Sequence, residues 1–246
     1  MKLSANLGFL WADRSLPDAI RAAKAAGFDA VEMHWPYDTP VADVQAALAE
    51  TGLPCLGLNT RKGETNGLCA IPGQEDAARA SIDEAIAYAR AIDAGAVHVM
   101  AGFAEGRDAD AVFRAALTHA CDAAPDLTIL IEPLNRFDAP GYFLTTTGQA
   151  AEIIAAVDRP NLKLMFDCYH AQIMEGDLTR LFTGLKDIVG HVQFAGVPAR
   201  GRPDEGEIAF DRLLPALGWD APFGAEYKPG GDTDATLGWM AGYRAL

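Results

Sequence analysis

The chain lacks long apolar runs and has only four cysteines. No segment reaches the ~18 consecutive apolar residues that a membrane-spanning helix needs, so we expect no membrane partner. The N-terminal stretch MKLSANLGFLW has no cleavage pattern behind an apolar core, so we expect no signal peptide. The cysteines, at positions 55, 69, 121 and 168, form no CxxC pair, which argues against a disulfide framework and predicts a reduced, cytoplasmic protein.

Basic residues are also scarce. The sequence has 20 Lys and Arg against 34 Asp and Glu, a formal net charge of −14 at pH 7. A field of this sign repels phosphate backbones, so nucleic acid is not an expected partner. The same field disfavours small anionic substrates, unless a local cation or a metal reverses the potential at the binding site.

No linker rich in serine, glycine or proline divides the chain, and no run of like charge marks a boundary. Half of the 246 residues are hydrophobic and 22 % are charged, which is the composition of a globular protein with a large core. Because α/β barrels of about 250 residues are usually single domains, we expect one domain over residues 1–246.

Short β-branched or apolar runs alternate with alanine-rich segments of helical periodicity along the whole chain. The expected strands cover residues 2–7, 30–35, 54–59, 96–100, 128–132, 162–167, 188–194 and 222–227. The segment SLPDAIRAAKAAG predicts a helix, with Ser15 at the N-cap, Pro17 in the first turn and Gly27 at the end. Residues 74–93 predict another, with acids in the first turn.

Eight strand–helix alternations favour an α/β fold of the (β/α)8 TIM-barrel type over an open doubly wound sheet. A dinucleotide-binding sheet would carry GxGxxG after its first strand, whereas GFLWADRS follows the first strand here. We therefore expect no organic cofactor. In a TIM barrel the chemistry takes place at the C-terminal ends of the strands, so the polar residues there are the candidates for a site.

Side chains of a strand alternate between the barrel interior and the helix layer. On this parity, four consecutive strands each end on an inward polar residue: Glu132, Asp167, Gln193 and Glu226. Three carboxylates in a site of low dielectric raise one another's pKa or recruit a cation. With an amide oxygen they form an all-oxygen set that suits Mg²⁺ or Mn²⁺ better than Zn²⁺. Parity alone leaves a metal site and a structural role both open.

The stretch LKLMFDCYH brings three common types of metal ligand together. The parity of the strand points Asp167 into the barrel mouth and Cys168 toward the helix layer, where a thiol packs as a small apolar group. His170 lies past the strand end, where it can lean over the pocket and contact a substrate. Only the aspartate is expected to bind metal.

Several stretches resemble the hydroxypyruvate isomerase family, which belongs to the xylose isomerase-like TIM barrels. They are HVMAG (98–102), IEPLN (131–135), DCYHAQ (167–172), HVQFAGVPARGRPDEGEI (191–208) and EYKPGG (226–231). The matches extend from the first predicted strand to the C-terminal region. The strings around Gln193 and Glu226 are the most specific, whereas an isolated DxxH would be weak.

The resemblance implies a divalent metal held by Glu132, Asp167, Gln193 and Glu226. It also implies that Glu132 and Glu226 act as the acid/base pair, and that His170 and Arg200 contact the substrate. In related sugar epimerases the ligand on strand seven is a histidine, so Gln193 favours the hydroxypyruvate isomerase side of the group. A homo-oligomer is compatible with this resemblance.

Other candidates are less specific. Lys228 and His98 are candidates for binding the substrate, although a solvated lysine at the rim and a hydrogen-bonded core histidine are the alternatives. We interpret His34 and His119 as structural or surface residues. The aromatic residues Trp11, Trp35 and Tyr37 either wall the pocket or belong to the core or an interface.

The reaction that the resemblance implies is the conversion of hydroxypyruvate to 2-hydroxy-3-oxopropanoate (tartronate semialdehyde). A proton leaves one carbon and returns to its neighbour through a cis-enediolate, whose two oxygens a divalent metal can chelate. A 2-oxo-tetronate isomerase or a keto-sugar epimerase would use the same ligands. An endonuclease IV-like phosphodiesterase would need more histidines and a basic groove, and a decayed barrel that only binds or scaffolds would not keep the ligand set.

Overall fold

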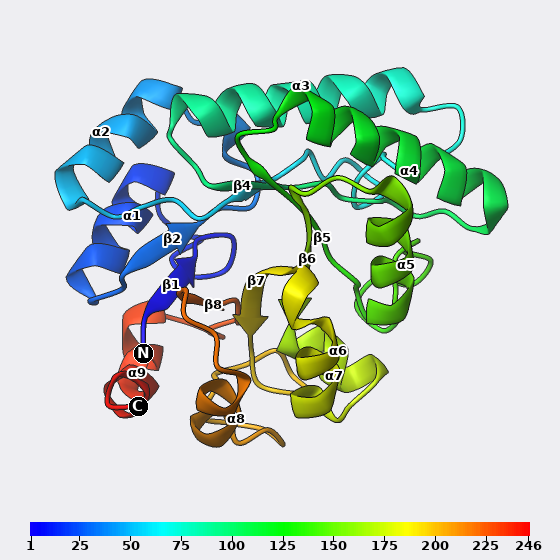
Figure 1. Cartoon of the computed structure of the whole chain (residues 1–246). Helices are drawn as coiled ribbons and strands as arrows, with labels where there is room; N and C mark the ends of the chain where they lie inside the picture. Colours follow the sequence, from blue (N-terminus) through cyan, green and yellow to red (C-terminus); the bar gives the residue numbers. More distant parts are fainter.

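Eight parallel strands form one sheet in the order β2-β1-β8-β7-β6-β5-β4-β3 in the computed structural model, which describes residues 1–246 (Figure 1). The strands are β1 (Leu3–Asn6), β2 (Ala30–Glu32), β3 (Leu58–Asn59), β4 (Ala96–His98), β5 (Thr128–Ile131), β6 (Leu162–Asp167), β7 (Val189–Phe194) and β8 (Phe223–Ala225). Each lies within, or coincides with, one of the eight predicted ranges.

The two ends of this sheet are joined by backbone hydrogen bonds. The Val31 N–H donates to the Pro54 carbonyl at 3.0 Å, and the Val31 carbonyl accepts from the Leu56 N–H at 2.8 Å. The Met33 N–H donates to the Gly57 carbonyl at 3.0 Å. Because these bonds connect β2 to the segment that leads into β3, the sheet closes into a TIM barrel, as predicted.

Helices connect successive strands and surround the barrel (Figure 1). They are α1 (Leu16–Ala25), α2 (Val41–Thr51), α3 (Glu75–Ala91), α4 (Gly106–Ala123), α5 (Thr147–Val157), α6 (Cys168–Met174), α7 (Leu178–Leu185), α8 (Phe210–Leu217) and α9 (Met240–Arg244). There are also three 3-10 helices, which are η1 (Pro36–Asp38), η2 (Lys186–Ile188) and η3 (Thr233–Trp239). None of the helices is long and apolar enough to cross a membrane.

Local signals in the sequence set the ends of these elements. The Ser15 side chain accepts from the Asp18 N–H at the start of α1, as an N-cap does, and Gly27 has a left-handed φ of 91° just after the helix. The second helix predicted from acids in its first turn is α3. All four cysteines are buried and free, so the expectation of no disulfide is confirmed.

The predicted parity of the strands is also confirmed. Inside the barrel, Leu130 and Met165 pack with Ala96 in a small apolar cluster below the mouth. On the outer side of β6, the Phe166 ring meets the Phe182 ring of α7 at 5.3 Å between centroids. Alternate residues of one strand therefore pack either inside the barrel or against the helices. The residues that point inward continue to the C-terminal ends of the strands.

We expect Gly224→Ala to destabilise the barrel. An added Cβ at Gly224 would lie 2.1 Å from Oε1 of Glu32 and 2.9 Å from Cγ of Gln193, both of which are buried. Overpacking of this kind lowers the free energy of unfolding by about 1–3 kcal/mol, measurable by urea denaturation. Gly184→Ala is the control: nothing lies within 4 Å of its added Cβ, and alanine favours α7 by up to about 1 kcal/mol. Equal stability of the two variants would contradict the packing argument.

Candidate active site at the barrel mouth

The four predicted ligands lie at the C-terminal ends of four neighbouring strands. Glu132 directly follows β5, Asp167 is the last residue of β6, and Glu226 directly follows β8. Asp167 pairs in register with Gln193 of β7, which pairs in turn with Gly224 of β8. All four side chains belong to buried residues, so the mouth contains three carboxyl groups with little access to water.

A cavity of about 140 Å³ opens at this end of the barrel. Its lining includes Glu132, Glu226, His170 and Arg200, together with Lys62 from the loop after β3. The cavity is smaller than the ~300–1,000 Å³ of sites that take drug-sized ligands. It therefore suits a substrate of a few carbon atoms.

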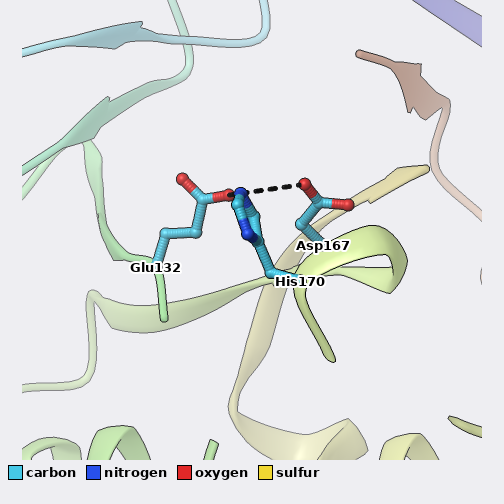
Figure 2. A group of neighbouring side chains, drawn as sticks. All are labelled: Glu132, Asp167 and His170. Atoms are coloured by element: carbon cyan, nitrogen blue, oxygen red, sulfur yellow. Dashed lines mark ion pairs between the residues drawn. The ribbon is translucent and has the colours of Figure 1, made fainter. Parts of the chain in front are cut away.

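Glu132, Asp167 and His170 form a group that could hold a metal ion (Figure 2). One ligand atom from each residue lies within 4.8 Å of the others, and all three residues are buried. The Nε2 atom of His170 lies 3.6 Å from Oδ2 of Asp167 and 3.9 Å from Oε1 of Glu132. The Asp167 carboxylate also caps α6, because it accepts from the Tyr169 N–H at 2.8 Å.

The hydrogen bonds of His170 define which of its nitrogens carries the proton. Its Nδ1 accepts from the Asn135 backbone N–H at 3.0 Å and lies 2.8 Å from the Asn135 Nδ2. The Asn135 Oδ1 accepts from the N–H groups of Phe137 and Asp138, so its NH₂ end faces the histidine. Burial lowers the pKa of His170 to about 3, and a neutral imidazole that accepts at Nδ1 carries its proton on Nε2.

The Nε2–H of His170 is thus a buried donor with no partner in the protein. A metal ion bound there would first have to displace this proton. The oxygens of Glu132 and Asp167 are better suited to a cation, and the histidine is better suited to donate to an oxygen of a substrate.

Arg200 supplies the positive charge between two of the carboxylates. Its Nη2 donates to Oε2 of Glu226 and lies 3.4 Å from Oδ2 of Asp167. The guanidinium lies over the rings of Phe9 and Tyr169, 5.0 Å from each centroid. Stacking between two aromatic rings and pairing with two carboxylates holds this side chain in the mouth.

Opposite environments separate the two glutamates. Burial alone would raise the pKa of Glu226, but the charge of Arg200 and the hydrogen bond from His34 hold it well below its usual range. Burial and the charges of Glu226 and Asp167 raise the pKa of Glu132 well above its usual range. Burial also raises the pKa of Asp167 to about 7, against the charge of Arg200. The surroundings of the mouth therefore favour the ionised form of Glu226 and the protonated form of Glu132.

Of the two alternatives for His34, a structural and a surface residue, the second is wrong, because the side chain is only 11 % exposed. Its Nε2 bonds to Oε1 of Glu226 at 2.8 Å, and its ring lines the cavity. The same glutamate oxygen accepts from the Asn6 Nδ2 at 3.0 Å. Gly8 leaves room for the ring, because an added Cβ would lie 2.0 Å from the His34 Nδ1. The parity argument, applied to the second strand, would have placed His34 inward with Glu32.

Sequence reasoning also missed Glu32, which orients the amide of Gln193. The Glu32 Oε2 accepts from the Gln193 Nε2 at 2.9 Å and bonds to the His191 Nε2 at 2.8 Å. A carboxylate can only accept, so the amide presents its NH₂ end to Glu32 and leaves its oxygen free. That oxygen, Oε1, is buried and has no hydrogen-bond partner. Burial alone would lower the pKa of His191, but the charge of Glu32 raises it.

The other substrate-binding candidates lie in different places. His98 is buried and lines the cavity, with Nδ1 3.2 Å from the Asn59 Oδ1 and 3.8 Å from Oε2 of Glu132. Burial lowers the pKa of His98 to about 3. The side chain of Lys228 is exposed and does not line the cavity, although its backbone N–H donates to the Arg200 carbonyl at 2.7 Å.

The remaining predictions concern the surroundings of the mouth. Trp35 lines the cavity, whereas Trp11 is buried against Phe28. His119 bonds to Asp83 on the surface at 2.7 Å, as interpreted from the sequence. Cys168 is completely buried, which agrees with its interpretation as a packed thiol.

The donor set fits a hard divalent cation. Oε1 of Glu132 and Oε1 of Gln193 are buried oxygens without a hydrogen-bond partner, and the Asp167 and Glu226 carboxylates both pair with the one guanidinium of Arg200. Oxygen donors of this kind bind Mg²⁺ or Mn²⁺.

Comparison with known proteins identifies relatives over nearly the whole chain. Residues 20–243 match the family model described as a xylose isomerase-like TIM barrel. The chain is 42 % identical to a putative hydroxypyruvate isomerase of Homo sapiens, over 99 % of this chain and 95 % of that protein. It is 39 % identical to a 2-oxo-tetronate isomerase of Cupriavidus necator, over 98 % of each chain.

A solved structure from Brucella melitensis has the same architecture. It is described as an AP endonuclease of family 2 and is 35 % identical to this chain over 98 % of both chains. The TM-score of 0.93 shows that the two barrels agree along nearly their whole length.

We expect Asp167 to make the stability of the metal-free protein depend on pH. Its pKa is about 7 in the folded protein against an ordinary value of 3.8, so the folded state binds the extra proton between these values. The stabilisation from this group is complete below about pH 4 and is lost as the pH rises through 7, by up to about 4 kcal/mol.

Urea denaturation in a chelating buffer between pH 4 and 8 measures this effect. The difference in free energy of unfolding between the wild type and Asp167→Asn should fall across the range, because asparagine does not titrate. Asp13→Asn, at an exposed position, is the control and should give a constant difference. A constant difference for Asp167→Asn as well would contradict the assignment.

Proposed function

Because the chain belongs to the xylose isomerase-like TIM barrel family, we propose that it interconverts hydroxypyruvate and 2-hydroxy-3-oxopropanoate. It is an isomerase, as are its curated relatives at 35–42 % identity over nearly the full chain. The observation that carries the proposal is a small cavity lined by Glu132, Glu226 and His170, where Asp167 and Glu132 lie close to the free Nε2–H of His170.

Glu132, Asp167, Gln193 and Glu226 would together hold Mg²⁺ or Mn²⁺. When bound, such a cation supplies positive charge that stabilises the two adjacent oxygens of a cis-enediolate. The oxygen that Glu32 leaves free on Gln193 supports its assignment as a ligand.

The proton transfer falls to the two glutamates. One carboxylate removes a proton from C3 of hydroxypyruvate, and a proton is returned to C2 while the hydroxyl proton moves from the oxygen on C3 to the oxygen on C2. Glu132 and Glu226 are the acid/base pair, and such groups typically contribute about 10²–10⁴-fold to a rate. The Nε2–H of His170 donates to a substrate oxygen, and Arg200 pairs with Glu226.

A 2-oxo-tetronate isomerase is the second candidate. The relative of that name in Cupriavidus necator is nearly as similar as the human one, and its substrate class carries the same 2-oxo acid group. The name of the Brucella melitensis structure raises phosphodiester hydrolysis as a third candidate. The net charge of −14 opposes binding to DNA, so we consider this activity a poor fit for the chain.

An isomerase assay discriminates among these functions. We expect the protein to convert hydroxypyruvate in the presence of Mg²⁺ or Mn²⁺ and to lose this activity in EDTA. A four-carbon 2-oxo acid and a DNA duplex with an abasic site are tested in parallel. A higher kcat/KM on the four-carbon acid would establish the second candidate, and DNA cleavage without isomerisation would overturn the proposal.

Glu132→Gln tests the double role of this residue. We expect kcat/KM to fall by about 10²–10⁴-fold, because the amide cannot exchange the proton, and Mn²⁺ binding measured by calorimetry to weaken. Glu175→Gln is the control, because that carboxylate binds the first turn of α5 outside the cavity. Full activity of Glu132→Gln would remove Glu132 from the acid/base pair.

A further inference from the structure

We propose that Lys62 binds the carboxylate of the substrate and so makes the site prefer 2-oxo acids over neutral keto alcohols. This inference rests on the proposed isomerase function and names the group that would recognise the acid end of its substrate. Lys62 lies in the loop between β3 and α3 and lines the cavity that also contains Glu132 and Glu226.

The charges around the cavity leave a substrate anion few partners. The lining has three acidic residues, Glu132, Asp138 and Glu226, and only two basic ones, Arg200 and Lys62. Apart from a bound metal ion, whose charge the carboxyl groups of the mouth would share, only these two side chains offer positive charge to a substrate carboxylate.

Arg200 is already engaged. Its guanidinium is buried in the mouth, where it pairs with Glu226 and lies 3.4 Å from the Asp167 carboxylate. Lys62 is exposed, and its Nζ has neither a hydrogen bond to the protein nor a carboxylate within 4.0 Å. Its one aromatic contact is with the Trp35 ring, 5.3 Å from Nζ to the centroid. That contact uses the charge of the ammonium but leaves its three N–H donors for a ligand.

The backbone that carries Lys62 is attached to the barrel. The Lys62 carbonyl accepts from the Gly67 N–H at 2.6 Å, and the Thr65 carbonyl accepts from the Phe103 N–H at 2.9 Å. Gly67 forms an antiparallel bridge with Ala101, in the segment after β4. The turn needs glycine there, because φ is 105° and an added Cβ would lie 2.3 Å from the Met100 carbonyl. The lysine side chain therefore starts from a fixed point at the rim.

Two aromatic side chains, Trp35 and His34, connect the Lys62 ammonium to Glu226. The Trp35 ring beneath it packs against the ring of His34, with 4.9 Å between centroids, and His34 bonds to Glu226. A substrate whose carboxylate meets Lys62 at the rim places its C2 and C3 atoms deeper, toward the carboxyl groups of the mouth. The lysine then offsets the repulsion that an acidic protein exerts on an acidic substrate.

The experiment compares Lys62→Met with Lys62→Arg and with Lys228→Met. Lys228 is a matched control, because it is an exposed lysine beside the site that does not line the cavity. Each variant is assayed on hydroxypyruvate and on 1,3-dihydroxyacetone, in which a neutral CH₂OH group replaces the carboxylate. Where turnover of dihydroxyacetone is too slow, its inhibition constant against hydroxypyruvate is measured instead.

We expect Lys62→Met to raise KM for hydroxypyruvate by about 10- to 100-fold, the effect of losing a charged hydrogen bond, with kcat nearly unchanged. The KM or inhibition constant for dihydroxyacetone should stay the same in Lys62→Met. Lys62→Arg should restore most of the affinity for hydroxypyruvate, and Lys228→Met should behave as the wild type. Equal effects of Lys62→Met on both compounds, no effect on either, or the same effect from Lys228→Met would overturn the inference.

A binding measurement separates this inference from the proposed function. Pyruvate carries the 2-oxo acid group but lacks the hydroxyl on C3, so its binding by calorimetry requires no isomerisation. If the wild type isomerises no 2-oxo acid, the proposed function fails, and the pyruvate titration still tests Lys62. Weaker pyruvate binding by Lys62→Met than by Lys228→Met would support the carboxylate site. Equal binding, or no binding to the wild type, would refute it.

Discussion

Glu132, Asp167 and Glu226 place three carboxyl groups at one barrel mouth with little water around them, and like charges so close cannot all be ionised without a compensating cation. The protein meets this constraint unevenly. Arg200 and His34 hold Glu226 in its charged form, whereas Glu132 has a raised pKa and an oxygen without a partner. This imbalance gives two neighbouring glutamates opposite proton affinities, and a divalent cation would complete the charge balance.

Small residues make the arrangement around these carboxylates sterically feasible. Gly8 leaves space for the imidazole of His34, and Gly224 leaves space for the carboxylate of Glu32 in the barrel interior. Glu32 in turn accepts from the NH₂ end of Gln193, so that the amide oxygen stays free. The proposed ligand set thus depends on residues that would never touch the metal, and they act by occupying space and by restricting which hydrogen bonds their neighbours can make.

A protein of negative net charge that binds an acidic substrate needs a region of positive electrostatic potential at its binding site. Within the cavity the buried Arg200 is neutralised by its own carboxylates, so the charge at the rim matters more than the net charge of −14 suggests. Lys62 stands there without a carboxylate partner, on a turn that hydrogen bonds fix to the barrel. In this proposal the carboxylate of the substrate binds at the rim and proton transfer takes place deeper in the mouth. Because recognition and chemistry would then use different residues, the mouth can remain rich in carboxylates.

The positions of the strands could be predicted from the sequence, because eight short apolar runs alternate with helical segments. The residues that point into the barrel could also be predicted, because side chains of a strand alternate with a period of two. The convergence of Glu132, Asp167, Gln193 and Glu226 follows from this rule alone, although their roles stay predictions. Loop side chains obey no such period. The tertiary structure decided that Lys62 lines the cavity while the side chains of residues such as Lys228 point to solvent, because hydrogen bonds between distant segments set where each loop backbone runs.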